Sequence, residues 1–247
     1  MIKVSKRLCN IFILTAATYT PISIASSEII SVAAVYALPP YVMEDGHSGI
    51  EIEILRSALS QSRNIVLRLD YIPADRMHEE IQSGHFMAGL TAVEDETKTD
   101  LFFSDVHVEY QNVLVALKDS KISVKNLSDL NKIKVVGFKN ARKYLGREFS
   151  NAILNNKNYS ERTSMESSVK QLFSQRTEAI IIDRYIFEFI SKQMGLDKNK
   201  AEYFEIFDKN PMRVAFKTEA MRDEFNKGLY SIRKSGIYNE ILKKYTQ

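Results

Sequence analysis

The sequence predicts an α/β protein made of two similar units with a crevice between them. Apolar strands alternate with helical segments in the first part of the chain, and the same alternation starts again after residues 110–118. A chain that alternates strands and helices forms a sheet with helices on both faces. With 247 residues, the chain suits one large domain or two small ones. We therefore expect two α/β units, the second inserted before the chain returns to the first.

The first unit follows the order β-α-β-α-β. An apolar run is stopped by Pro39-Pro40, and the next segment has apolar residues at helical spacing. Strict alternation then indicates a strand, and Gly84 is a good end for the short helix after it. The expected elements are strand 29–41, helix 50–59, strand 64–71, a helix ending at Gly84, and strand 86–92.

The second unit repeats the pattern after a charged stretch. Its clearest element is the apolar run EAIIID, which predicts a buried strand, and Gly195 ends the helix that follows. The expected elements are strand 110–118, strand 132–138, helix 140–155, helix 167–173, strand 178–183, helix 184–194, strand 211–217, and two final helices at 219–234 and 236–245.

The first 25 residues have the order of a secretory signal peptide. Three positive charges in MIKVSKR precede an apolar stretch, and Ser23 and Ala25 are small residues at the two positions that a signal peptidase recognises. A short membrane anchor is the alternative, but Pro21 and several threonines break the run below the roughly 20 apolar residues that a span needs. We expect export to the periplasm with cleavage near Ala25.

Removal of this segment changes the composition. It carries three basic residues and no acid, so the formal net charge falls from +3 to zero, which gives no support to nucleic-acid binding. Cys9, the single cysteine, leaves with it, and the mature chain then has no disulfide and no thiolate nucleophile. The four histidines lack metal-ligand spacing. We expect no metal, no cofactor and a monomer.

Several phrases in order carry a family resemblance: LPPYVMEDGHSGIEIEIL, IQSGHFMAGLTAV, FFSD, YQNVLVALK, LSDLNKIKVVGF and QRTEAIIID. Over about residues 29–245, the chain resembles family 3 of the bacterial extracellular solute-binding proteins, the periplasmic components of polar amino-acid uptake systems. The resemblance implies a periplasmic binding protein-like fold of type II, with two α/β lobes joined by a two-strand hinge near Val113–Lys118 and Asp208–Met212. The implied division is signal peptide 1–25, lobe one 26–114, inserted lobe two 115–209, and C-terminal return 210–247.

One ligand residue of that family is missing. In the amino-acid binders, an arginine soon after the segment that GLT matches pairs with the ligand α-carboxylate, and a guanidinium suits this bidentate geometry better than an ammonium. Here Glu96 or Thr97 stands at that position, and Lys98 is only a nearby charge. We therefore expect other cations to hold the ligand, with Glu96 in the ligand loop.

Two arginines are candidates for the missing clamp. Arg76 belongs to a P-x-x-R phrase that, by similarity to a branch of the family, lies on the crevice side; the alternative is a solvated arginine paired with a nearby acid. Arg142 follows GFKNA, where the family has a turn whose backbone N–H groups meet the carboxylate at a helix N-terminus. Its alternative is an exposed basic helix face.

Four further residues complete the predicted site. Asp183 ends the strand EAIIID, where the family places an acid that receives the ligand ammonium group; it also suits the cap of helix 184–194. Tyr41 matches an aromatic residue that covers the ligand through stacking or cation–π contact, or else belongs to the core. Gly89 and Thr91 are expected to form hydrogen bonds with the ligand.

The sequence thus predicts a non-enzymatic periplasmic protein that closes on a small polar, carboxylate-bearing ligand, an amino acid or a related compound, for an ABC permease. Two alternatives stay open. One is an extracytoplasmic sensor that acts through a membrane partner. The other is a crevice dehydratase of the cyclohexadienyl type, in which Glu96 would need a raised pKa to act as acid or base.

Overall fold

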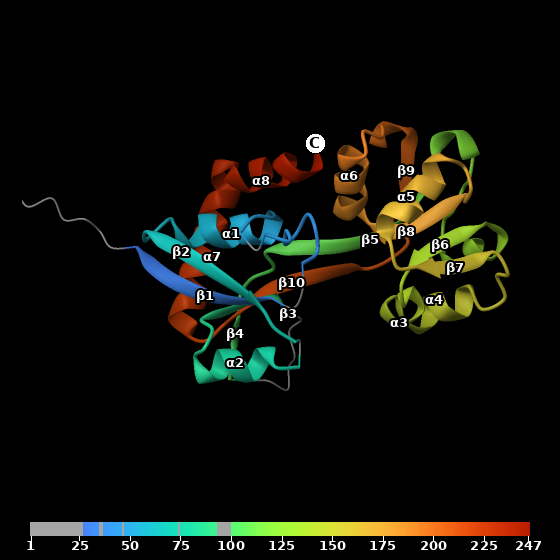
Figure 1. Ribbon diagram of the computed structural model, residues 1–247. Coiled ribbons are helices and arrows are strands. Elements are labelled where there is room, and N and C mark those ends of the chain that lie inside the picture. Colours follow the sequence, from blue (N-terminus) through green and yellow to red (C-terminus); the bar gives the residue numbers. More distant parts are fainter. Residues whose placement is uncertain (1–26, 35–36, 46, 74, 93–99) are drawn as a thin grey trace, which may run out of the picture.

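The computed structural model describes residues 27–34, 37–45, 47–73, 75–92 and 100–247, which form two lobes (Figure 1). Two long strands, β5 (Val108–Leu117) and β10 (Lys209–Phe216), run side by side from one lobe to the other. No helix in these ranges is both long and apolar enough to cross a membrane.

The first lobe is built on a mainly parallel sheet. β1 pairs in parallel with β2 and β3, and β10 closes this part of the sheet in the antiparallel direction. Helices α1 and α7 pack so closely that a Cβ on Gly228 would lie 2.0 Å from the Ala58 carbonyl oxygen. The elements are β1 (Glu28–Ala34), α1 (Ile50–Leu59), β2 (Ile65–Tyr71), α2 (Met77–Ser83), β3 (Ala88–Ala92), β4 (Phe102–Phe103), α7 (Glu219–Ser235) and α8 (Ile237–Thr246).

The second lobe repeats the arrangement with β6 parallel to both β7 and β8. Its helices cover both faces of the sheet (Figure 1). The elements are η1 (Lys118–Ser120), η2 (Leu127–Lys132), β6 (Val135–Phe138), α3 (Ala141–Tyr144), α4 (Gly146–Ala152), β7 (Tyr159–Arg162), α5 (Met165–Phe173), β8 (Ala179–Asp183), α6 (Arg184–Gln193), η3 (Lys198–Lys200) and β9 (Ala201–Phe204), where η marks a 3₁₀ helix.

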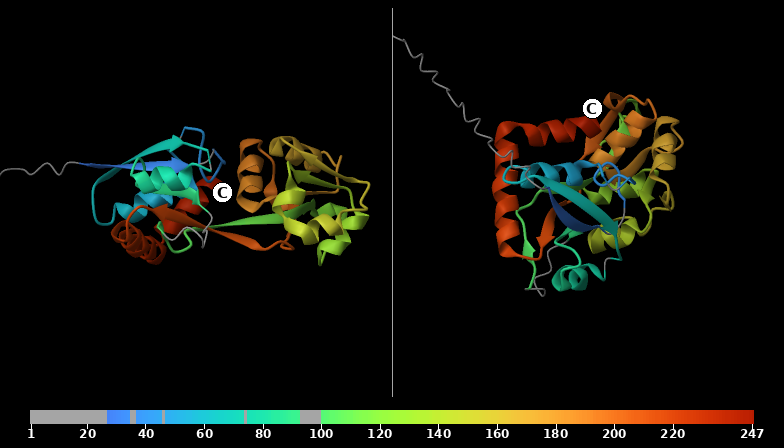
Figure 2. Two further views of the ribbon diagram at one scale, coloured as in Figure 1. Left: turned by 90° about the horizontal axis from the view of Figure 1, so that it is seen from below. Right: turned by 60° about the vertical axis from the view of Figure 1, so that its left-hand side comes forward.

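The two lobes share β5. Its residues Val108–Gln111 pair with Lys209–Met212 of β10, and Asn112–Ala116 pair with β8. The strand therefore changes partners between Gln111 and Asn112, just ahead of the crossing expected near Val113–Lys118. The left view in Figure 2 shows the two crossing strands at one side of the interval between the lobes.

Three apolar clusters bury the sheet faces. One includes residues of α1, α7 and α8 in the first lobe and of α5 and α6 in the second, and it continues through Val113 and Val115 of β5. The other two lie on the opposite faces, one under α2 and one under α3 and α4. Each sheet is thus covered on both faces, as the apolar runs of its central strands predict.

Some predicted elements differ from the structure. Helix 140–155 is divided into α3 and α4, because Gly146, the first residue of α4, has a left-handed φ of 82° that a continuous α-helix does not allow. Strand 29–41 is shorter than expected: β1 ends at Ala34, and Leu38 and Val42 form an isolated bridge around the Pro39-Pro40 turn. The short strands β4, β7 and β9 were not expected from the sequence.

Candidate functional site

The carboxyl ends of the parallel strands in the two lobes face each other. β8 is parallel to β6 and ends at Asp183, and this residue contacts Tyr41, which follows β1 in the first lobe. Crevices at the carboxyl ends of such strands are common ligand sites in α/β proteins. The interval between the lobes is therefore the candidate site.

Asp183 and Tyr41 are joined by a direct hydrogen bond across this interval. The Tyr41 hydroxyl donates to Oδ1 of Asp183 at 2.8 Å. The backbone N–H groups of Tyr185 and Ile186 also donate to Oδ1, at 2.9 and 3.2 Å, and that of Gln111 donates to Oδ2 at 2.8 Å. Asp183 is thus the N-cap of α6, as the alternative interpretation expected, and its carboxylate is satisfied by donors of the protein itself.

Burial dominates the electrostatics of this pair. Asp183 is only 6% exposed, and burial raises its pKa to about 6, although the hydrogen bonds from Tyr41 and the backbone act in the opposite direction. Burial and the neighbouring Asp183 carboxylate raise the pKa of Tyr41 well above its usual value. At pH 7, therefore, the pair consists of a neutral phenol and a mainly ionised carboxylate.

The ring of Tyr41 belongs to the core. Tyr41 is fully buried, and its ring lies 4.0 Å from that of Tyr110, centroid to centroid. The Tyr110 hydroxyl donates to Glu51, whose other oxygen is 2.9 Å from Nε2 of His107. Glu51 and His107 are both fully buried. Although Glu51 lies in the first turn of α1, it is therefore a core residue and not a solvated one. The sequence offered no signal for this network.

Arg76 precedes α2 as its N-cap residue. Its guanidinium pairs with Glu80 one turn later, and Glu80 also bonds Nδ1 of His85 at 2.7 Å. Both contacts lower the pKa of Glu80, and the hydrogen bond with His85 has the larger effect. The Arg76 side chain is 60% exposed, so it keeps solvent access beside this local ion pair.

Gly89 fills a packing role in the structure. A Cβ at this position would lie 2.7 Å from Cδ1 of Ile81 and 3.0 Å from the sulfur of Met77, so the glycine lets α2 lie close on β3. Thr91 is part of β3, but its side chain, like the whole of Glu96, lies outside the described residues.

Arg142 lies at the exposed start of α3, and its guanidinium is 5.1 Å from the centre of the Tyr159 ring. The backbone turn in front of it has an internal partner. Glu161 accepts hydrogen bonds from the N–H groups of Asn140 and Arg142, at 2.8 and 3.0 Å, and from the Tyr159 hydroxyl at 2.9 Å. The N–H groups expected to meet a ligand carboxylate therefore meet a carboxylate of the protein.

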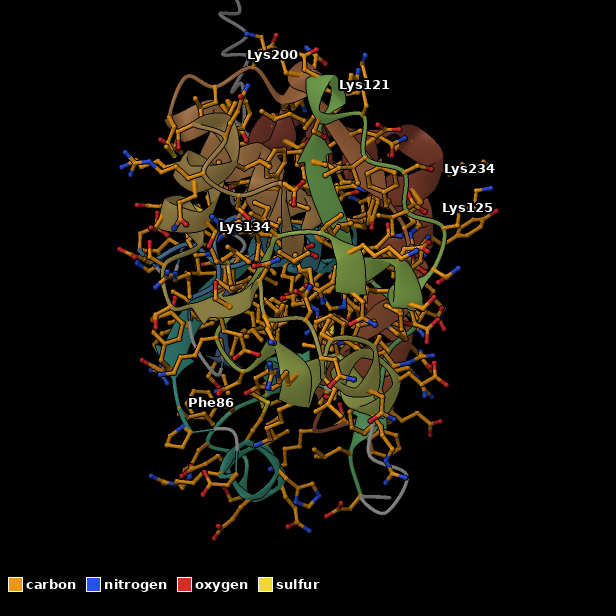
Figure 3. All side chains as sticks on the ribbon, turned by 90° about the vertical axis from the view of Figure 1, so that its right-hand side faces the viewer. Phe86, Lys121, Lys125, Lys134, Lys200 and Lys234 are labelled. Atoms are coloured by element: carbon orange, nitrogen blue, oxygen red, sulfur yellow. The ribbon has the colours of Figure 1, made fainter. Side chains whose placement is uncertain are left out.

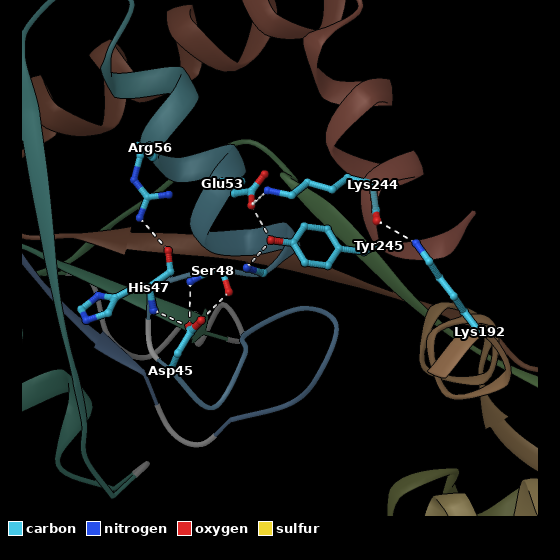
Figure 4. A network of polar contacts seen from close by, with 9 residues as sticks. Asp45, His47, Ser48, Glu53, Arg56, Lys192, Lys244 and Tyr245 are labelled. Atoms are coloured by element: carbon cyan, nitrogen blue, oxygen red, sulfur yellow. Dashed lines mark hydrogen bonds and ion pairs between the residues drawn. The ribbon is translucent and has the colours of Figure 1, made fainter. Parts of the chain in front are cut away.

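A second set of contacts joins the lobes through α8 (Figure 4). Tyr245 accepts from the N–H of Gly49 at 2.8 Å and donates to Glu53, to which Lys244 also donates, at 2.6 Å. The carbonyl of Lys244 in turn accepts from the ammonium group of Lys192 on α6, at 3.1 Å. The C-terminal end of α8 is thus bonded to both lobes, and a cation there suits the helix dipole.

Several exposed lysines of the second lobe lie away from the interval. Lys121, Lys125 and Lys200 are exposed at the periphery of the second lobe (Figure 3) and do not contribute to its inner surface. Within the described part of the chain, no group of three or more His, Cys, Asp or Glu residues is arranged to hold a metal ion. The structure therefore brings together Tyr41 and Asp183 of the predicted site, and leaves the two arginines in separate local contacts.

Comparison with known proteins agrees with this architecture. The family model of the bacterial extracellular solute-binding proteins, family 3, matches residues 30–247. The arginine-binding periplasmic protein of Mannheimia haemolytica is 24% identical over 221 residues, which cover 84% of this chain and 86% of that protein.

Solved structures show the same fold. A polar amino acid ABC uptake transporter substrate-binding protein from Streptococcus thermophilus aligns with a TM-score of 0.73 at 18% identity, over 88% of this chain and 86% of that one. A histidine kinase sensor domain with similarity to periplasmic binding proteins aligns with a TM-score of 0.59 at 17% identity, over 89% and 96% of the two chains. The fold is that of the type II periplasmic binding proteins. The match over residues 30–247 shows that this chain belongs to family 3 of the bacterial extracellular solute-binding proteins.

Proposed function

We propose that this protein binds a small polar ligand, an amino acid or a related compound with a carboxylate, between its lobes in the periplasm and delivers it to an ABC permease. The proposal rests on the family match over residues 30–247, in a chain whose two lobes present facing strand ends. The ligand stabilises the closed arrangement by contacting both lobes, while β5 and β10 act as the hinge. In this proposal the first lobe comprises residues 26–114 and the C-terminal return 210–247, and the second lobe comprises residues 115–209.

Arg76 on the first lobe and Arg142 on the second are the proposed contacts to the ligand carboxylate. Both side chains are exposed, and neither is fixed in a buried ion pair. The contact of Arg142 with a tyrosine ring leaves its charge free of a partner acid within the described residues. Gly89, Thr91 and Glu96 belong to the proposed first-lobe wall.

Asp183 is the proposed acceptor for a ligand ammonium group. Because its oxygens already accept four hydrogen bonds, the ligand has to take the place of one donor. The Tyr41 hydroxyl is the donor that a side-chain movement can remove, since the other three are backbone N–H groups of β5 and α6. Ligand binding in this proposal thus exchanges an internal contact between the lobes for one through the ligand.

A thermal-shift screen of the purified protein against amino acids, small organic acids and peptides tests the function, because a tight ligand raises the melting temperature by mass action. For the compound found, calorimetry should give roughly tenfold weaker binding to Arg76→Ala and to Arg142→Ala. Lys121→Ala, an exposed change at the periphery of the second lobe, is the control and should bind as the wild type. Unchanged affinity in both arginine variants would remove the anion assignment.

A sensor that reports ligand occupancy to a membrane partner is the second candidate. The observation in its favour is the fold shared with the histidine kinase sensor domain. Cross-linking in cells distinguishes the two: ligand-dependent capture of a permease supports delivery, and capture of a kinase or another signalling protein supports sensing. The dehydratase alternative has a direct assay, because purified protein that turns over neither prephenate nor arogenate is not such an enzyme.

A further inference from the structure

A chain of buried contacts leads from the core of the first lobe to Asp183. Nε2 of His107 lies 2.9 Å from one oxygen of Glu51, and the other oxygen of Glu51 accepts from the Tyr110 hydroxyl. The Tyr110 ring lies 4.0 Å, centroid to centroid, from that of Tyr41, whose hydroxyl donates to Asp183. Glu51 belongs to α1, Tyr110 to β5 and Asp183 to the end of β8. The chain therefore connects the interior of one lobe with the carboxyl end of a strand in the other.

Glu51 and His107 form the fixed end of this chain. Both oxygens of Glu51 have partners, as a fully buried carboxylate requires. Backbone contacts hold His107 on both sides: its N–H donates to the carbonyl of Met212 in β10 at 3.0 Å, and its own carbonyl accepts from Tyr238 at 2.9 Å. Among the described residues Nδ1 of His107 has no partner, so the contact with Glu51 is the polar contact that orients the ring.

Tyr41 is held by Glu51 in two ways. The backbone N–H of Glu51 donates to the Tyr41 carbonyl at 2.9 Å. The side chain of Glu51 acts through Tyr110, whose bonded ring packs against Tyr41 with the two planes tilted by 32°. Tyr185 of the second lobe lies farther from Tyr41, at 6.1 Å between ring centroids. Glu51 therefore fixes the backbone of Tyr41 directly and its ring through Tyr110, while the Tyr41 hydroxyl reaches Asp183.

We propose that Glu51 is a positioning residue for the ligand site: through Tyr110 it holds the Tyr41 hydroxyl on Asp183 until the ammonium group of a ligand takes that place. The inference rests on the proposed function, in which Asp183 accepts the ligand ammonium group. Because a buried carboxylate needs donors, the bond from Tyr41 helps to satisfy Asp183 while the site has no ligand. A change in the Glu51 side chain should therefore alter the Asp183 carboxyl group in the other lobe.

The pKa of the Asp183 carboxyl measures how well Tyr41 is held, because the hydrogen bond from Tyr41 is the largest of the contributions that lower this pKa. Carbon-13 NMR of protein with labelled aspartate follows the titration, and Asp183→Asn assigns the signal. Tyr41→Phe should raise the pKa from about 6 toward about 7. Tyr110→Phe keeps the ring but loses the bond to Glu51, and it should raise the pKa in the same direction.

A double variant tests whether the two tyrosines act in one chain. In the Tyr41→Phe background, Tyr110→Phe should cause no further rise in the pKa of Asp183, because the hydroxyl that it positions is already gone. Tyr71→Phe is the control, since its hydroxyl bonds the carbonyl of Met43 within the first lobe, and it should leave this pKa unchanged. An unchanged pKa in Tyr110→Phe would overturn the proposal, even if the melting temperature falls.

Two substitutions of Glu51 separate positioning from charge. Glu51→Gln and Glu51→Leu both remove the negative charge, but only the amide keeps an oxygen that accepts from Tyr110. The pKa of Asp183 should therefore be higher in Glu51→Leu than in Glu51→Gln, whereas a role of Glu51 through its charge alone predicts equal values, which would also overturn the proposal. Should Glu51→Leu fail to fold, Tyr110→Phe and its double variant decide the question. The titration needs no ligand, so a failed ligand screen counts against the proposed function and leaves this outcome readable.

Discussion

The hydroxyl of Tyr41 donates to the carboxylate of Asp183 at 2.8 Å, although the two residues lie 142 positions apart and in different lobes. Both are buried, with exposed fractions of 0% and 6%. This bond fixes one lobe against the other in a directional way that the crossing strands alone do not provide. The arrangement of the lobes therefore determines the surroundings of the Asp183 carboxyl group and the Tyr41 hydroxyl group.

Tyr41→Phe should loosen the contact between the lobes. The change removes only the hydroxyl and leaves the buried carboxylate with one donor fewer, which costs about 1–2 kcal/mol of unfolding free energy. Fluorescence transfer between one label on each lobe should show a wider distribution of distances. Tyr71→Phe is the control, because its hydroxyl bonds the carbonyl of Met43 within the first lobe. An identical distance distribution in Tyr41→Phe and wild type would contradict this role.

Asp183 should make stability depend on pH in a defined direction. Since its folded pKa of about 6 lies above the unfolded value near 3.8, the folded protein binds this proton more tightly than the unfolded chain does. The contribution of Asp183 is therefore greatest below pH 4 and falls by about 3 kcal/mol as the pH rises through 6.

Urea unfolding between pH 4 and pH 7 measures this effect, with Asp183→Asn as the reference because it has no charge to titrate. The unfolding free energy of the wild type minus that of the variant should decrease over this interval. A difference that stays constant, or that increases with pH, would show that the hydrogen bonds to the carboxylate outweigh the effect of burial.

Glu161→Gln should lower the pKa of Tyr159. Burial is the largest cause that raises the pKa of Tyr159. The hydrogen bond to Glu161 and the negative charge of Glu161 raise this pKa further. A neutral amide removes the charge, and it also weakens the bonds from Asn140 and Arg142, at a cost of about 1–2 kcal/mol in unfolding free energy. Glu178→Gln is the matched control, since Glu178 accepts from a backbone N–H elsewhere in the same lobe. Spectrophotometric titration of the tyrosines should shift only in the first variant.

Gly228→Ala should destabilise the first lobe severely. The added methyl carbon would lie 2.0 Å from the Ala58 carbonyl oxygen, so α1 and α7 have to move apart, which costs about 2–4 kcal/mol. Gly195→Ala provides a comparison, because it meets nothing within 4 Å and only its φ of 65° is unfavourable. Its cost should be about 1 kcal/mol. Thermal unfolding that ranks the two variants in the opposite order would contradict the close packing.

Local patterns predicted most of the architecture. The run EAIIID became β8, fully buried, and Gly84 and Gly195 follow the ends of α2 and α6. The strand β7 was missed because its residues are partly exposed and polar, with no apolar alternation. The left-handed φ of Gly146, at the start of α4, divides the helix that the sequence predicted as continuous over 140–155.

The site was harder to predict, for physical reasons. Arg76 and Glu80 are separated by one helical turn, and the sequence left Asp75, Glu79 and Glu80 open as partners of Arg76. The bond from Tyr41 to Asp183 and the burial of Glu51 against His107 join segments that are distant in the sequence. No local pattern encodes such contacts. The sequence predicted both Tyr41 and Asp183 as ligand contacts, but not that each is the hydrogen-bond partner of the other.

The position of β10 has a consequence for how the chain acquires its structure. This strand lies between β3 and β5, and it begins only at Lys209. The sheet of the first lobe stays incomplete until nearly the whole polypeptide is present, whereas β6, β7 and β8 come from one continuous stretch. Since pairings between distant segments form slowly, we expect the inserted lobe to acquire protection from hydrogen exchange before the lobe that the ribosome makes first.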